Sequence, residues 1–199
     1  MKLTYFDVNG GRGEPIRLAM FLGNLDFNDH RFPFSDFAEV RKTTPLGQVP
    51  TLEIKGETIT QCNAITRYIG KLTNLYPQDA YQGLLCDEVM DAVEDISYRL
   101  VTTFGLEGDE LKNAREQISN TYIRPQMLWL EEKLTKAGRY FSDNRLTVAD
   151  LKVFVYLNWI ASGMLDHVPQ NMIDDTPKLK EFWQRIQTTP EIMDYYNER

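Results

Sequence analysis

The spacing of apolar residues along the chain changes near residue 76. Before that point, short runs of β-branched and aromatic residues alternate with stretches whose apolar residues lie three and four positions apart. After it, only the helical spacing remains, over much longer stretches. The first region therefore predicts strands that alternate with helices, and the second predicts helices alone.

In the first region the pattern predicts the order β-α-β-α-β-β-α. Strands are expected at residues 2–8, 26–32, 49–54 and 57–61, and helices at 14–25, 35–43 and 62–72. Crossover connections give parallel neighbours, and the tight turn between the last two strands gives an antiparallel pair. We expect an α/β domain with a mixed four-stranded sheet over residues 1–75.

The second region reads as an all-α domain over residues 81–199, after a linker at 76–80. Helices are expected at 82–104, 110–138 and 147–165, with shorter ones after Pro177 and Pro190. Thr147 and Asp150 form a T-x-x-D capping box at the start of the most apolar helix.

Charge and cysteine content narrow the function classes. The 199 residues carry a formal net charge of -7, with acidic and basic residues interspersed, so we expect neither a nucleic acid nor an anionic membrane as partner. No apolar run reaches the roughly 18 residues of a membrane span, and we expect a cytoplasmic protein. Two cysteines and two histidines, all far apart, predict no disulfide scaffold and no metal cofactor.

Residues 46–62 hold two features that together suggest a peptide ligand. Pro50 opens a strand that belongs inside the sheet, where a proline has no N–H for the ladder. A cis Val49–Pro50 bond would leave the backbone of Val49 free to pair with an extended peptide, although an ordinary trans proline is the commoner state. Gln61 and Cys62 stand where the first N–H groups of a helix would attract a carboxylate. A small peptide with a free carboxylate fits both.

Several motifs in order, "KLTYF", "GRGEPIR", "LGQVPTLE", "TITQCNAITRYIGK", "MDAVEDI" and "LTVADL", resemble the cytosolic glutathione transferases. The resemblance covers essentially the whole chain and is greatest to the sigma class, which includes the haematopoietic prostaglandin D synthases. It implies a thioredoxin-like N-terminal domain followed by an all-α domain, with glutathione as co-substrate and a homodimer as the active unit.

By this resemblance Tyr5 is the catalytic residue, whose hydroxyl donates a hydrogen bond to the glutathione sulfur and favours the thiolate, and Arg12 assists it. A thiol has a pKa of about 8.5, and this pKa must fall by about two units for the thiol to be mostly ionised at neutral pH. Without the resemblance, Tyr5 would be interpreted as a core aromatic residue of the strand and Arg12 as a solvated loop charge.

The resemblance also implies the groups that bind glutathione. Val49, which precedes Pro50, pairs with the cysteinyl backbone, and Gln61 and Cys62 bind the γ-glutamyl carboxylate. Asp95 reaches the glutathione amino group from the partner subunit. Further contacts to the glycyl end and the peptide backbone are implied for Phe37, Arg41 and Gln48. For Arg41 an exposed helix charge is an equally simple interpretation.

The electrophilic second substrate is expected between the loop from Val8 to Gly11 and the helical domain. Tyr98, Thr102 and Tyr156 are expected as wall residues, although aromatic residues at helical spacing are more often core. An apolar pocket with polar tips suits lipid-derived or halogenated aromatic electrophiles.

The chain departs from the sigma pattern at three places. Cys62 replaces a serine, Phe37 replaces a tryptophan, and the loop "DVNGGRGE" is one residue longer. Conjugation of glutathione to hydrophobic electrophiles is the leading hypothesis for the function. The alternatives are glutathione-dependent prostaglandin isomerisation, hydroperoxide reduction, and a non-catalytic ligand carrier or crystallin-like relative.

Overall fold

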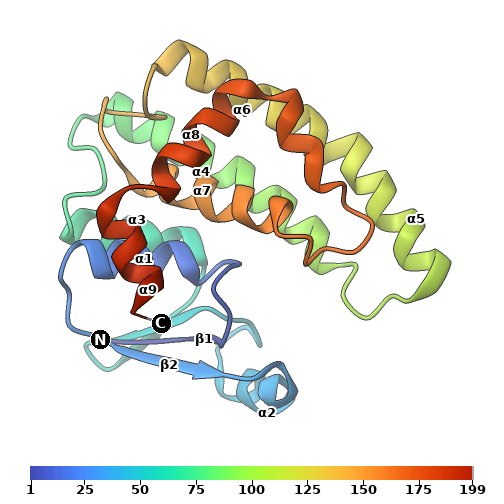
Figure 1. Cartoon of the computed structure of the whole chain (residues 1–199). Coiled ribbons are helices and arrows are strands. Elements are labelled where there is room, and N and C mark those ends of the chain that lie inside the picture. Colours follow the sequence, from blue (N-terminus) through green and yellow to red (C-terminus); the bar gives the residue numbers. More distant parts are fainter. Residues whose placement is uncertain (199) are drawn as a thin grey trace. The chain divides into compact units, whose positions relative to one another are not determined.

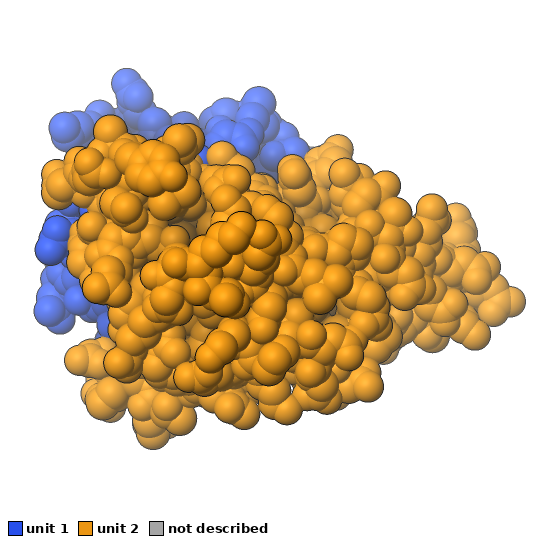
Figure 2. Space-filling view, turned by 90° about the horizontal axis from the view of Figure 1, so that it is seen from above, with its two compact units in different colours: residues 1–76 blue, residues 77–199 orange. Residues whose placement is uncertain are grey.

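The computed structural model describes residues 1–198 of the chain, which divide into two compact units. The first is Met1–Tyr76 and the second begins at Pro77 (Figure 2). Each unit has its own buried core, and each is described separately.

The first unit is a four-stranded sheet with strand order β2-β1-β3-β4 and three α-helices. Its elements are β1 (Lys2–Phe6), α1 (Glu14–Leu22), β2 (Asn28–Phe32), α2 (Phe37–Val40), β3 (Thr51–Ile54), β4 (Glu57–Ile59) and α3 (Cys62–Leu72). β1 and β2 are parallel, and β3 is antiparallel to both β1 and β4. The predicted mixed sheet and the order β-α-β-α-β-β-α are confirmed.

The helices α1 and α3 lie side by side along one face of this sheet (Figure 1). Pro15 stands in the first turn of α1, where its missing N–H would have had no partner within the helix. Leu3, Ile16, Leu52 and Ile69 are among the fully buried side chains that join the sheet to the two helices.

The segment expected as one helix at 35–43 is broken into shorter pieces. α2 has four residues and is flanked by 3₁₀ turns at Phe34–Asp36 and Arg41–Thr43. The Ser35 hydroxyl donates to the carboxylate of Asp36 rather than capping the helix, so the expected start of this helix was wrong.

The second unit contains only helices among its described residues. They are α4 (Ala80–Val101), α5 (Gly108–Ile118), α6 (Arg124–Ala137), α7 (Val148–Ala161), α8 (Pro177–Gln187) and α9 (Pro190–Asn197), with a 3₁₀ segment at Gln170–Asp175. A π-helical segment at Ser119–Ile123 joins α5 to α6, where the sequence pattern indicated one uninterrupted helix.

α7 forms the centre of the second unit and packs against α4 and α8. Most of its residues are buried, among them a carboxylate at its N-terminus, Asp150. Asp150 accepts hydrogen bonds from the N–H and the hydroxyl of Thr147, at 2.8 and 2.7 Å, and from the N–H of Phe141 at 3.0 Å. The predicted capping box is present, and it also fixes the segment that leads into the helix.

We expect Asp150→Ala to lower the free energy of unfolding by about 2–5 kcal/mol, because it leaves buried N–H groups at residues 141 and 147 without an acceptor. Asp79→Ala is the matched control, since Asp79 caps α4 at an exposed position by accepting from the N–H of Gln82. Its loss should be about 1 kcal/mol. Urea denaturation measures both, and equal losses would contradict this account of Asp150.

Candidate active site

Tyr5 lies near the end of β1, with only 6 % of its surface exposed. It forms a small apolar cluster with Phe32 and Val49, against which Phe6, Val8, Phe37 and Val40 pack. The structure therefore brings four of the sequence-predicted site residues together in the first unit: Tyr5, Val8, Phe37 and Val49.

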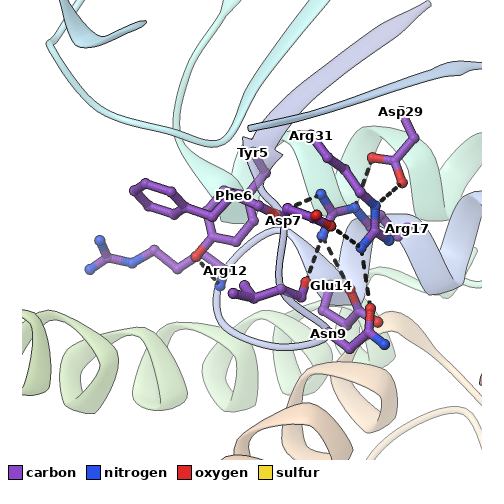
Figure 3. Close-up of polar contacts among 10 residues, drawn as sticks. Tyr5, Phe6, Asp7, Asn9, Arg12, Glu14, Arg17, Asp29 and Arg31 are labelled. Carbon is purple, nitrogen blue, oxygen red and sulfur yellow. Dashed lines mark hydrogen bonds and ion pairs between the residues drawn. The ribbon is translucent and has the colours of Figure 1, made fainter. Parts of the chain in front are cut away.

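The Tyr5 hydroxyl accepts a hydrogen bond from the backbone N–H of Arg12 at 3.0 Å (Figure 3). The contact uses the main chain of Arg12, and the guanidinium group extends away from the hydroxyl in this view. Because the phenol oxygen accepts from the loop, its own proton is left to donate to another acceptor.

Two glycines make this close approach possible. A Cβ at Gly11 would lie 2.5 Å from the Tyr5 hydroxyl oxygen, and a Cβ at Gly13 would lie 2.4 Å from the tyrosine ring. Gly11 also has a φ of +66°, which L residues rarely adopt. The loop can thus surround the tyrosine only because it lacks side chains at these positions.

Burial raises the pKa of Tyr5 to about 12, although the hydrogen bond from Arg12 and the charge of its guanidinium act in the opposite direction. The phenol is therefore fully protonated at neutral pH. A protonated phenol can donate a hydrogen bond to an anion, and it cannot serve as a general base.

Arg17, a fully buried residue of α1, was not predicted from the sequence as part of the site. Its guanidinium donates to the carbonyl oxygens of Val8 and Phe6, at 3.0 and 3.1 Å, and lies 5.6 Å from the centre of the Tyr5 ring. It is also paired with Glu14 and Asp29. The available signal was a charged residue within the apolar positions of the helix, preceded by an acidic residue three positions earlier.

The Val49–Pro50 peptide bond is cis, as the sequence suggested. Val49 lies just beyond the β1–β3 ladder, whose last pair is Thr4 with Thr51. Within residues 1–198, neither the N–H nor the C=O of Val49 is paired with another backbone group. This backbone edge can accept an extended peptide as a further strand.

α3 begins at Cys62, and the side chain of the preceding Gln61 makes no capping hydrogen bond. Gln61 precedes it with a φ of +71°, in the left-handed region that a glutamine rarely occupies, and its side chain is exposed. Such an outlier is often maintained for function. Cys62 is buried, with its thiol 3.7 Å from the amide oxygen of Asn63.

The predicted contacts at the other end of the peptide site lie around α2. Phe37 is half-buried in an aromatic group with Phe6, at 5.1 Å between ring centres, and Phe32. The Arg41 guanidinium lies 5.3 Å from the Phe37 ring centre. Arg41 and Gln48 are both exposed, so their head groups are accessible to a ligand.

The predicted residues of the second unit lie on α4 and α7. Asp95, Tyr98 and Thr102 are exposed, and Tyr98 has 64 % of its surface accessible. Tyr156 is buried, and its hydroxyl has no hydrogen-bond partner within the part of the chain that the structure describes. Burial raises the pKa of this phenol far above its usual value.

Among the described residues, no group of three or more His, Cys, Asp or Glu side chains could hold a metal ion, and no helix is long and apolar enough to cross a membrane. A cavity of about 390 Å³ in the second unit contains none of the predicted residues. Its lining consists of Leu134, Gly138, Arg139, Lys178, Glu181 and Arg185.

Because the loop packs closely around Tyr5, we expect one methyl group added at Gly11 to affect both the position of the tyrosine and the stability of the protein. Gly11→Ala should displace the tyrosine and lower the free energy of unfolding by about 1–2 kcal/mol, since alanine disfavours a positive φ. Gly10→Ala is the control, because a Cβ there meets nothing within 4 Å. The tests are urea denaturation and NMR of ¹³C-labelled tyrosine, and an unmoved Tyr5 resonance in Gly11→Ala would refute the expectation.

Comparison with known proteins identifies the family of the chain. The profile of the glutathione S-transferase N-terminal domain matches residues 1–71, and that of the C-terminal domain matches residues 94–199. Glutathione S-transferase 3 of Caenorhabditis elegans is 32% identical, over 100% of this chain and 96% of the relative.

Two solved structures have similar folds along the whole chain. Prostaglandin synthase D of Nilaparvata lugens matches with a TM-score of 0.87 and 26% identity, over 100% of this chain and 97% of the other. A structure of a glutathione S-transferase from the hookworm Necator americanus, described as monomeric, matches with a TM-score of 0.80 and 25% identity, over 100% and 96%. The chain belongs to the glutathione S-transferase family.

Proposed function

We propose that the chain conjugates glutathione to hydrophobic electrophiles, with Tyr5 stabilising the glutathione thiolate that attacks. The observation that carries the proposal is the protonated Tyr5 phenol, which accepts from the Arg12 N–H at 3.0 Å and so directs its own proton towards a ligand. A hydrogen bond to a thiolate stabilises the charged form and lowers the pKa of the thiol. The sulfur is then a nucleophile at neutral pH.

Arg12 acts in this proposal mainly through its main chain. Its N–H polarises the Tyr5 hydroxyl, because a donor to the phenol oxygen strengthens the hydrogen bond that the phenol itself donates. The positive charge of the guanidinium adds a favourable field for a thiolate, as it does for the phenolate form of Tyr5.

Glutathione would be bound as a short added strand. The free backbone groups of Val49, beside the cis Pro50, support pairing with the cysteinyl residue. The uncapped N-terminus of α3, with Gln61 and Cys62, supports binding of the γ-glutamyl carboxylate. Arg41 and Gln48 are proposed for the glycyl end, next to the half-buried Phe37.

Tyr98, Thr102 and Tyr156 are proposed as the electrophile-binding side chains of the second unit, with Val8 and Gly11 contributing from the first. The unpartnered hydroxyl of Tyr156 supports a role in hydrogen bonding to a polar group of the substrate.

A cytoplasmic location is also proposed. The two cysteines are buried free thiols, which supports a reducing compartment.

A homodimer is proposed as the active unit, with Asp95 of each chain directed to the glutathione of the other. Tyr81, Leu84 and Tyr98 share the exposed side of α4 with Asp95, and each of the three has more than 60 % of its surface accessible. Large exposed apolar side chains along one helix are typical of an interface. Because a related hookworm enzyme is described as monomeric, the assembly requires its own measurement.

A second activity is also proposed, because one similar structure is a prostaglandin synthase. Isomerisation of a prostaglandin endoperoxide would use the same thiolate and the same tyrosine. An assay with the endoperoxide and glutathione decides whether this activity accompanies conjugation.

Tyr5→Phe tests the main proposal, because it removes the hydroxyl and leaves the ring in its cluster. The ultraviolet absorbance of the thiolate, followed against pH, should give bound glutathione a thiol pKa about one to two units below its free value in the wild type. In Tyr5→Phe the pKa should return to about 8.5 or above, and turnover of an activated aryl halide at pH 6.5 should fall tenfold or more.

Tyr68→Phe is the control for this experiment, since Tyr68 is an exposed tyrosine of the same unit. It should behave as the wild type. Equal thiol pKa values in the wild type and Tyr5→Phe would refute the role of Tyr5.

Asp95→Asn tests the composite site. We expect the Kd for glutathione to rise about tenfold, because a charge-assisted hydrogen bond to the amino group is lost, while the thiol pKa of bound glutathione stays as in the wild type. Asp91→Asn, one turn earlier on the same exposed side, is the control. Sedimentation velocity gives the oligomeric state, and a fully active monomer that is indifferent to Asp95→Asn would refute the composite site.

A further inference from the structure

The loop between β1 and α1 has to place the Arg12 N–H against the Tyr5 hydroxyl, although it is one residue longer than the pattern that it resembles. A longer loop has more conformations to lose when it is ordered. Something in the structure must therefore hold it in the one conformation that makes this contact. Two arginines contact the loop and its flanks (Figure 3).

Arg17 holds the end of the loop that follows β1. It donates to the carbonyl oxygens of Phe6 and Val8, which are main-chain groups at the exit of the strand. Within the described part of the chain the Arg17 guanidinium makes no hydrogen bond to residues 9–13, and the Arg17 main-chain N–H reaches only the carbonyl oxygen of Gly13, at 3.1 Å, so these contacts leave the middle of the loop unfixed.

Arg31 reaches the middle of the loop from β2, where it is paired in register with Tyr5. Its Nη1 donates to the side-chain oxygens of Asn9, at 3.2 Å, and Asp7, at 3.4 Å. Within residues 1–198, Arg31 is the hydrogen-bond partner of the Asn9 side chain. Asn9 lies three residues before Arg12, so its position limits where the Arg12 N–H can lie.

Asp29 connects the two arginines. Its Oδ1 accepts from Nε of Arg17 at 2.8 Å, and its Oδ2 accepts from Nε of Arg31 at 2.7 Å. Burial acts to raise the pKa of Asp29, but the hydrogen bonds from Arg31 and Arg17 outweigh it and hold the pKa below its usual value. The carboxylate therefore remains charged throughout the neutral range and orients both guanidinium groups.

We propose that Arg31 is a positioning residue for thiolate activation: through Asn9 and Asp7 it holds the β1–α1 loop so that the Arg12 N–H stays on the Tyr5 hydroxyl. The inference rests on the proposed role of Tyr5. In this proposal the Arg31 side chain acts through the loop and not by contact with the ligand. The competing explanation is that Arg31 only stabilises the edge of the sheet.

The experiment compares four single variants and one double variant by the thiol pKa of bound glutathione and by turnover at pH 6.5 and pH 9. Arg31→Gln removes the bridging cation, Asn9→Ala removes only its contact in the loop, and Asn9→Asp keeps an acceptor for Arg31. Lys2→Gln is the matched control, because it removes an exposed ion pair of the same sheet, Lys2 with Glu53 at 2.8 Å.

We expect Arg31→Gln and Asn9→Ala to raise the thiol pKa by about half a unit to one unit. Turnover should then fall about three- to tenfold at pH 6.5 and little at pH 9, where the thiol ionises without help. Asn9→Asp and Lys2→Gln should keep the wild-type pKa. The double variant Arg31→Gln with Asn9→Ala should show a shift smaller than the sum of the two single shifts, because both changes break the contact between Arg31 and Asn9.

A purely structural Arg31 would give another result: lower thermal stability in Arg31→Gln with an unchanged thiol pKa, which overturns the inference. A wild-type pKa in Asn9→Ala also overturns it, and this variant decides the matter if Arg31→Gln does not fold, since Asn9 is exposed. If the thiol pKa of bound glutathione is lowered in the wild type and returns to its free value in Tyr5→Phe, the proposed function stands whatever the Arg31 and Asn9 variants show. If the wild type has an ordinary thiol pKa, the proposed function fails and this inference fails with it.

Discussion

The hydrogen bond from the Arg12 N–H to the buried Tyr5 hydroxyl is the contact on which the chemistry of the first unit depends. In the proposed mechanism the Tyr5 hydroxyl accepts a hydrogen bond from the loop and donates one to a ligand. It therefore needs a defined orientation. Burial keeps the phenol protonated, and the main-chain donor fixes which way its proton points. Neither condition is sufficient alone, because a buried phenol without the loop contact would be free to rotate its proton elsewhere.

The rest of the first unit provides the geometry for that contact. β1 pairs Tyr5 with Arg31 of β2, and its ladder with β3 ends one residue earlier, at Thr4 with Thr51. The loop closes over the tyrosine because residues 11 and 13 are glycines. Val49 lies just before β3, which runs antiparallel to β1, and it packs against the same tyrosine. In the described part of the chain its N–H and C=O are not paired with another backbone group. The order of strands thus brings a protonated phenol and the strand edge proposed to bind a peptide to one place.

Much of this arrangement could be predicted from the sequence because its signals are local. A proline at the start of an inner strand indicated the special bond at Val49–Pro50, and the T-x-x-D pattern indicated the cap of α7. The contact of Arg17 with Asp29 could not be predicted, because it joins α1 to β2, and the contacts of Arg31 with Asp7 and Asn9 could not, because they join β2 to the β1–α1 loop; the tertiary fold sets both neighbourhoods. The break into α2 and its 3₁₀ turns was missed because Ser35, a common cap residue, bonds Asp36 instead.

The departures from the sigma pattern acquire a physical meaning in this context. A thiol at Cys62 is a poor hydrogen-bond donor, and a phenylalanine at residue 37 has no polar atom to offer. The proposed site therefore depends on donors that substitution cannot remove: the main-chain N–H groups of Val49, Arg12 and the first turn of α3. Main-chain donors are only as well placed as the loops that carry them. A site of this kind requires more from its supporting contacts than one built on side-chain donors. The two arginines paired with Asp29, Arg17 fully buried and Arg31 half-buried, supply such support beside the loop that is longer than the sigma pattern.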